Sequence, residues 1–126
     1  MPLTRISLRQ GKPASFKRAV MTEVYEAMRE TFNVPEDDRF MTITEHGEDA
    51  FWFGRHYLGI SRSDELIMIQ ITANNTRSIE QKKALYRRIV ERLVASLGIR
   101  VEDVFISLVE VAKENWSFGD GEAQYA

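Results

Sequence analysis

The chain opens with Met1-Pro2-Leu3-Thr4-Arg5-Ile6-Ser7-Leu8, an alternating segment that predicts a first β-strand. A turn cluster follows, and the apolar residues of 15–32 then recur at helical spacing. Asn33 and Pro35 end this helix, and 39–44 alternates again as a strand. Strand, helix and strand in this order predict a βαβ unit with two parallel strands.

The same pattern recurs in the second half of the chain. The segment 65–72 is an apolar strand, Ser78 and Gln81 predict a capping box at a helix start, Gly98 ends that helix, and 104–109 is a further strand. A single shift of 65 residues superposes the halves without a gap, relating Ile6 to Ile71, Lys17 to Lys82, Asn33 to Gly98, Asp38 to Asp103, Phe40 to Phe105 and Glu45 to Glu110. The chain therefore contains two fused copies of one unit.

These patterns predict an α+β fold of two fused β-α-β repeats, with a four-stranded mixed sheet and two helices on one face. We expect a single domain over 1–126, with repeat one at about 2–45, a connector at about 46–63, repeat two at about 64–110 and a C-terminal tail at 111–126. The aromatic-rich connector is either a hairpin or an extended segment. The second-repeat strand is apolar on both sides, so the tail or another subunit must cover the other face. We expect a closed cyclic oligomer.

Composition narrows the classes of function. The chain has 126 residues, 44% hydrophobic and 29% charged, as is ordinary for a globular domain. A net charge of −2 and a pI of about 5.7 argue against a nucleic-acid surface. There is no cysteine, and the two histidines alone are no zinc pattern, so we expect neither metal nor cofactor. No segment resembles a membrane span or a signal peptide, so we expect a cytoplasmic protein without a membrane partner.

Pro2 is the first candidate for chemistry. If Met1 is removed, the chain begins with a secondary amine, which acts as a base, an acid or a nucleophile towards a carbonyl. An apolar pocket would lower the pKa of this amine and a neighbouring carboxylate would raise it. The alternative is that Pro2 is only the second residue of a strand.

Two charged residues are candidates to act beside this amine. Asp38 precedes the second strand, whose start lies at the same end of a parallel pair as the start of the first. Arg77 lies just before a helix N-terminus, where a guanidinium and the helix dipole attract a substrate carboxylate. The alternatives are a solvated acidic loop and a surface arginine. In the tail, Trp116, Phe118 and Tyr125 either cap the sheet or form the wall of a pocket.

Taken together, these features resemble a known family. The amino-terminal Pro2, the doubled βαβ layout, the loop Pro35-Glu36-Asp37-Asp38-Arg39 and the tail Asn115-Trp116-Ser117-Phe118-Gly119-Asp120-Gly121-Glu122-Ala123-Gln124 are similar to the tautomerase superfamily. Within it, the chain most resembles the malonate semialdehyde decarboxylase group. The resemblance implies a homotrimer in which the proline amine lies in a pocket lined by subunit contacts.

The resemblance also implies roles for individual residues. Pro2 would be the catalytic group, Asp38 the carboxylate that holds the amine charged and orients it or a water, and Arg77 the arginine that binds the substrate carboxylate. The tail aromatics Trp116, Phe118 and Tyr125 fall on the family's apolar wall. Asn75 occupies the place of a second arginine of the decarboxylases; it can donate a hydrogen bond but brings no charge.

We therefore expect an enzyme that uses Pro2 on small 2-oxo or 3-oxo acids for keto-enol tautomerisation, with malonate semialdehyde decarboxylation or hydration as further reactions. The missing charge at Asn75 counts against decarboxylation more than against the superfamily. Two alternatives from other classes are a ligand-binding module that retains Met1 and a structural trimer of the same fold.

Overall fold

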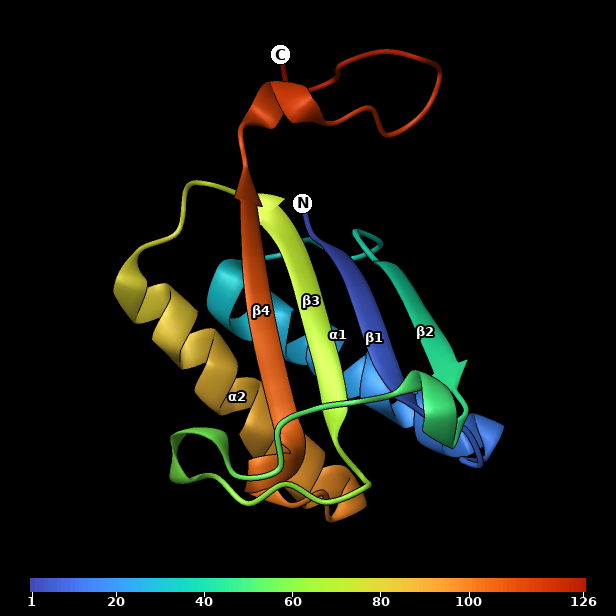
Figure 1. Cartoon of the computed structure of the whole chain (residues 1–126). Helices are drawn as coiled ribbons and strands as arrows, with labels where there is room; N and C mark the ends of the chain where they lie inside the picture. Colours follow the sequence, from blue (N-terminus) through green and yellow to red (C-terminus); the bar gives the residue numbers. More distant parts are fainter.

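The structure, a computed structural model that describes residues 1–126, contains one four-stranded sheet with two helices on one of its faces (Figure 1). The elements are β1 (Leu3–Arg9), α1 (Ala14–Phe32), β2 (Phe40–His46), β3 (Ile67–Asn74), α2 (Ile79–Leu97) and β4 (Val104–Val111). The strand order is β2-β1-β3-β4, in which β1 and β2 are parallel, β3 and β4 are parallel, and β1 and β3 are antiparallel. The predicted α+β fold is confirmed.

The two βαβ units match in detail. A shift of 65 residues carries the bounds of α1 onto those of α2. Both helices end in a left-handed residue, Asn33 with φ 54° and Gly98 with φ 65°, which lets the chain turn away from the helix axis. The Nζ of Lys17 lies 2.7 Å from Glu45, and its equivalent in Lys82 lies 2.8 Å from Glu110. Each copy therefore joins its helix to its second strand in the same way.

The correspondence continues into the connector and the tail. The 3-10 turn Glu48–Ala50 becomes the turn Lys113–Asn115 after the same shift, and Phe51-Trp52-Phe53-Gly54 becomes Trp116-Ser117-Phe118-Gly119. Each copy also carries an aromatic pair, with ring centroids 5.6 Å apart in the first and 5.4 Å in the second. The tail is thus the second copy's equivalent of the connector. The connector forms no strand, so it is the extended segment and not the hairpin.

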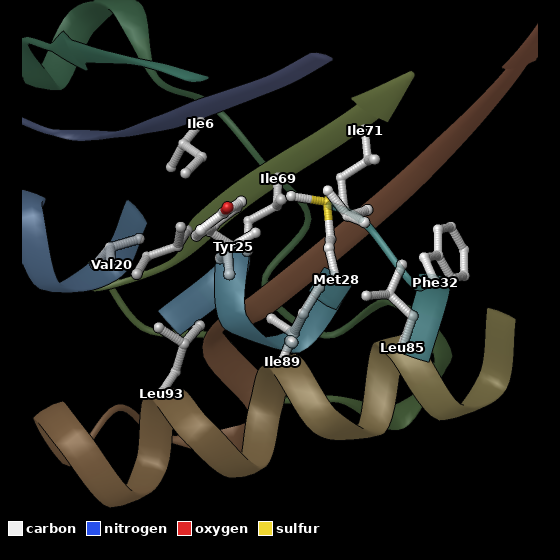
Figure 2. Close-up of a cluster of buried hydrophobic side chains, with 14 of the residues drawn as sticks. Ile6, Val20, Tyr25, Met28, Phe32, Ile69, Ile71, Leu85, Ile89 and Leu93 are labelled. Atoms are coloured by element: carbon white, nitrogen blue, oxygen red, sulfur yellow. The ribbon is translucent and has the colours of Figure 1, made fainter. Parts of the chain in front are cut away.

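The core lies between the sheet and the helices. In Figure 2, apolar side chains from both helices meet those of β1 and β3, and the residues that are at most 4% exposed include Ile6, Val20, Tyr25, Met28, Phe32, Ile69, Ile71, Leu85, Ile89 and Leu93. Each large aliphatic side chain buried here stabilises the fold by about 1.5–3 kcal/mol. The capping box predicted at the start of α2 is present between Ser78 and Gln81.

The opposite face of the sheet is open. Arg5, Thr42, Gln70 and Ser107 lie across it in register and line a hollow of about 530 Å³. The prediction that the second-repeat strand is apolar on both sides is wrong, because β3 turns Gln70 outwards among its half-buried neighbours. The tail extends beyond the end of β4, at the end of the sheet that carries the N-terminus, and leaves this face uncovered (Figure 1). Neither α1 nor α2 has the apolar length needed to cross a bilayer.

Candidate functional site

The chain's first residue lies beside Asp38. Because β1 and β2 are parallel, with Leu3 opposite Phe40, the residues that precede the two strands meet at one edge of the sheet. The α-amine of Met1 is 3.9 Å from Oδ2 of Asp38, and both side chains are only 10% exposed. Pro2 is buried between this amine and the strand. The amine that lies beside Asp38 is thus that of Met1, and the pairing of Asp38 with a Pro2 amine stays a prediction.

Burial shifts the ionisation of all three groups at this edge. It lowers the pKa of the Met1 amine, an effect that the Asp38 carboxylate partly offsets and the Arg77 guanidinium reinforces. Burial also raises the pKa of Asp38, while the amine and Arg77 act in the opposite direction. The pKa of Arg77 is lowered by burial, against the attraction of Asp38 and Tyr125. The site thus favours neutral forms more than open water does.

Asp38 keeps an acceptor available. Its Oδ1 is buried and accepts no hydrogen bond from the protein, although a buried carboxylate oxygen ordinarily has a donor. The amine interacts with the other oxygen. The carboxylate can therefore hold the chain-terminal amine and a second donor at the same time.

Arg77 is fixed by the end of the first helix. Its Nη2 donates a hydrogen bond of 2.9 Å to the carbonyl of Phe32, and the guanidinium lies 4.7 Å from the centroid of the Phe32 ring. Ser78, the next residue, is the N-cap of α2. Arg77 and Met1 line a hollow of about 470 Å³, together with Phe32, Asn33, Asn74, Thr76, Gln81, Lys113 and Tyr125.

The tail aromatics form a wall on the other side of the chain end. Trp116 stacks on Phe118 at 5.4 Å between ring centroids, and Phe118 meets Tyr125 edge to face at 4.9 Å. The indole Nε1 of Trp116 donates a hydrogen bond of 2.7 Å to Oδ1 of Asn74, which is 7% exposed. A mainly apolar hollow of about 190 Å³ lies between Trp116, Phe118 and Pro2. The wall is thus tethered to the end of β3.

The structure brings most of the predicted site residues together, but their roles stay predictions. The chain end, Arg77 and the three tail aromatics line two hollows that share Met1, and Asp38 lies beside the Met1 amine. Asn75 stands apart, because its side chain is exposed and lines neither hollow. Sequence reasoning missed Asn74 and Lys113, which do line the larger one. No group of three or more His, Cys, Asp or Glu side chains is placed to hold a metal ion.

Comparisons with known proteins agree on one family. A family described as tautomerase enzyme matches residues 38–119, and a second of the same description matches 2–60. The chain is 44% identical to "Probable tautomerase YusQ" of Bacillus subtilis (strain 168), over 98% of both chains.

Solved structures with this fold include two malonate semialdehyde decarboxylases. One was studied for its decarboxylase and hydratase activities: it is 29% identical, has a TM-score of 0.92, and the match covers 98% of this chain and 95% of that one. The other, the FG41 enzyme inhibited by 3-bromopropiolate, is 35% identical with a TM-score of 0.91, over 98% and 93%. A fused 4-OT described as a symmetric trimer has the same fold at 21% identity and a TM-score of 0.77, over 98% and 97%.

Proposed function

This chain belongs to the tautomerase superfamily, in the group like malonate semialdehyde decarboxylase, and we propose that it uses the amine of Pro2 on small 2-oxo or 3-oxo acids. The observation that carries the proposal is the placement of the amino-terminal residue: the Met1 amine lies 3.9 Å from Asp38, and Met1 lines one hollow with Arg77. Loss of Met1 frees the nitrogen of Pro2, which lines the adjoining apolar hollow.

The reaction that the site supports best is keto-enol tautomerisation. Neutral Pro2 accepts the proton of the enol hydroxyl and its ammonium form delivers a proton to carbon, so the amine returns to its starting state. Arg77 binds the carboxylate of the substrate and fixes the distance of the reacting carbon from Pro2. The aromatic wall of Trp116 and Phe118 excludes water from this step. Burial lowers the pKa of the Met1 amine at this edge of the sheet, and we expect it to favour a neutral Pro2 amine in the same way.

Decarboxylation or hydration is the second candidate, and Asp38 favours it. A carboxylate beside the amine stabilises the ammonium form, which polarises a 3-oxo group; in a second route the neutral amine condenses with that group, with loss of water, to an iminium. In either route the bond between the α-carbon and the carboxylate breaks, its electron pair moves into the polarised C=O or C=N system to give an enol or enamine, and carbon dioxide leaves. The two decarboxylase structures that resemble this chain support these reactions. Against them stands Asn75, which adds no charge and lies outside both hollows.

We propose that the working form is a homotrimer. The outer face of the sheet is open, with Phe40 and Phe105 about half exposed, and Pro2 lies at the end of a central strand. The trimer described for the fused 4-OT of the same fold supports this assembly. Sedimentation equilibrium tests it directly, and a monomer at micromolar concentration contradicts it.

The experiment that tests the proposed function compares wild type with Pro2→Ala. The substrates are the enols of 2-oxo acids, phenylenolpyruvate first, and malonate semialdehyde. We expect wild type to turn over at least one of them and Pro2→Ala to lose about 100-fold or more of kcat/KM, the usual contribution of an acid-base group. Full turnover by the variant contradicts the proposal. A wild type that retains Met1, binds these acids and turns over none of them favours the binding module instead.

A further inference from the structure

Lys113 is a cation that lines the larger hollow and has no part in the proposed reaction. It begins the 3-10 turn Lys113–Asn115, two residues after the end of β4, and lines the same hollow as Arg77. The register explains this placement, since Asn74 pairs with Val111 and the Asn75 N–H donates to the Val111 carbonyl. Two residues later, the chain is beside the turn that carries Arg77.

The fold does not require a lysine at this position. The 65-residue shift places Glu48 at the equivalent point of the first copy, in a 3-10 turn of the same length. By contrast, the helix-to-strand ion pairs of the two copies use the same residue types. Lys113 takes part in no ion pair of the structure and is exposed at the rim of the hollow. Its charge is therefore available to a ligand.

The charges around the hollow indicate what that ligand carries. The Asp38 carboxylate is occupied by the Met1 amine and does not line the hollow. Arg77 and Lys113 remain as two cations without a carboxylate in contact. Arg77 is half-buried and anchored on Phe32, whereas Lys113 is exposed on a long flexible stem, so the two differ in depth. The volume of about 470 Å³ is in the range of small-molecule sites and leaves room beyond a three-carbon acid.

We propose that Lys113 is a specificity-determining residue, which binds a second carboxylate of the substrate while Arg77 binds the carboxylate next to the reacting carbon. The site then selects oxo dicarboxylic acids over oxo monocarboxylic acids. This proposal rests on the proposed function, because it assigns the substrate class of the same site. Lys113 also supplies the positive charge that Asn75 lacks.

The test uses two substrates that differ by one charge, the enol of oxaloacetate and the enol of its 4-methyl ester. For Lys113→Gln, KM for the dicarboxylate should rise about five-fold, as for a solvent-accessible ion pair, with kcat unchanged and KM for the ester within two-fold of wild type. Lys113→Arg should restore the dicarboxylate KM. Lys83→Gln, the same substitution at an exposed lysine of α2 outside the hollow, should change neither KM. An equal effect of Lys113→Gln on both substrates, or no effect, overturns the proposal.

A binding experiment separates this proposal from the enzymatic one. Succinate and its monomethyl ester cannot undergo the reaction, so NMR titration of wild type and Lys113→Gln with both ligands reports charge recognition alone. We expect Lys113→Gln to weaken succinate binding several-fold and the ester hardly at all, whether or not wild type turns over an enol. Turnover without this difference overturns the role of Lys113 only, and the difference without turnover overturns the enzymatic proposal only.

Discussion

Replacing Asp38 by asparagine keeps the shape of the side chain and removes its charge beside the chain-terminal amine. If the free Pro2 amine takes the place of the Met1 amine, 3.9 Å from Asp38, two unit charges at that separation attract each other by about 1 kcal/mol in water and about 4 kcal/mol near a protein surface. The site is mostly but not fully shielded from solvent, so we take an attraction of about 2 kcal/mol between the carboxylate and the ammonium group. That energy corresponds to about a thirty-fold change in the protonation equilibrium of the amine.

The direction of this change follows from the charges. Asp38 raises the pKa of the Met1 amine and burial lowers it. We expect the same opposition at a free Pro2 amine, so Asp38→Asn leaves burial unopposed and the pKa of that amine falls. If Pro2 acts as a base, the acidic limb of the kcat/KM profile moves to lower pH and activity extends further into acid. If Pro2 acts as an ammonium acid, the basic limb moves to lower pH and activity at neutral pH is lost. The profile thus distinguishes tautomerisation by a neutral amine from decarboxylation by a cationic one.

The assay is the pH dependence of kcat/KM for phenylenolpyruvate and malonate semialdehyde, with wild type and two variants. Asp37→Asn is the matched control, because Asp37 is the exposed neighbour and its φ of 68° is a conformation that asparagine adopts readily. We expect the control profile to coincide with that of wild type. An Asp38→Asn profile with both limbs in place would refute the reasoning, because the titrating group would then lie away from this carboxylate.

Three further changes test the structure around the site. Asn74→Ala removes the acceptor of the Trp116 indole N–H. We expect the free energy of unfolding, measured by thermal unfolding, to fall by about 1–3 kcal/mol and KM to rise. An unchanged KM would mean that this hydrogen bond does not position the aromatic wall. Ile89→Ala should lower the free energy of unfolding in urea by about 2–5 kcal/mol without changing kcat, and a loss below 1 kcal/mol contradicts the packing. Lys17→Gln and Lys82→Gln should each lower the free energy of unfolding by less than about 1 kcal/mol, and by equal amounts. Unequal losses would contradict the equivalence of the two repeats.

The fold could be predicted because the strand-helix-strand pattern occurs twice in the sequence. Each copy carries a helical stripe between two strands, and a residue suited to left-handed backbone, Asn33 or Gly98, ends each helix. The outer face was harder to predict. Six consecutive apolar or amide residues read as a strand buried on both sides, although side chains of neighbouring strand residues point to opposite faces and Gln70 is exposed.

The candidate site could be predicted only in part, and Asn74 and Asn75 show why. The resemblance to the decarboxylases favours Asn75, but the buried amide that holds the Trp116 indole belongs to its neighbour Asn74. Whether Asn74 or Asn75 meets the indole depends on the register between β3 and β4, which cannot be predicted from a single sequence. The same register brings Lys113 to the hollow. Lys113 lies in the tail, and in the sequence the tail resembles the connector only through the aromatic residues that precede Gly54 and Gly119.

The central claim is an unblocked proline nitrogen at the head of the working chain. Tandem mass spectrometry of the amino-terminal peptide tests it most directly, on a sample whose turnover of phenylenolpyruvate is measured in parallel. We predict that the active protein begins at a free Pro2. An active sample whose chains all retain Met1, and so hold Pro2 in a peptide bond, would contradict the account.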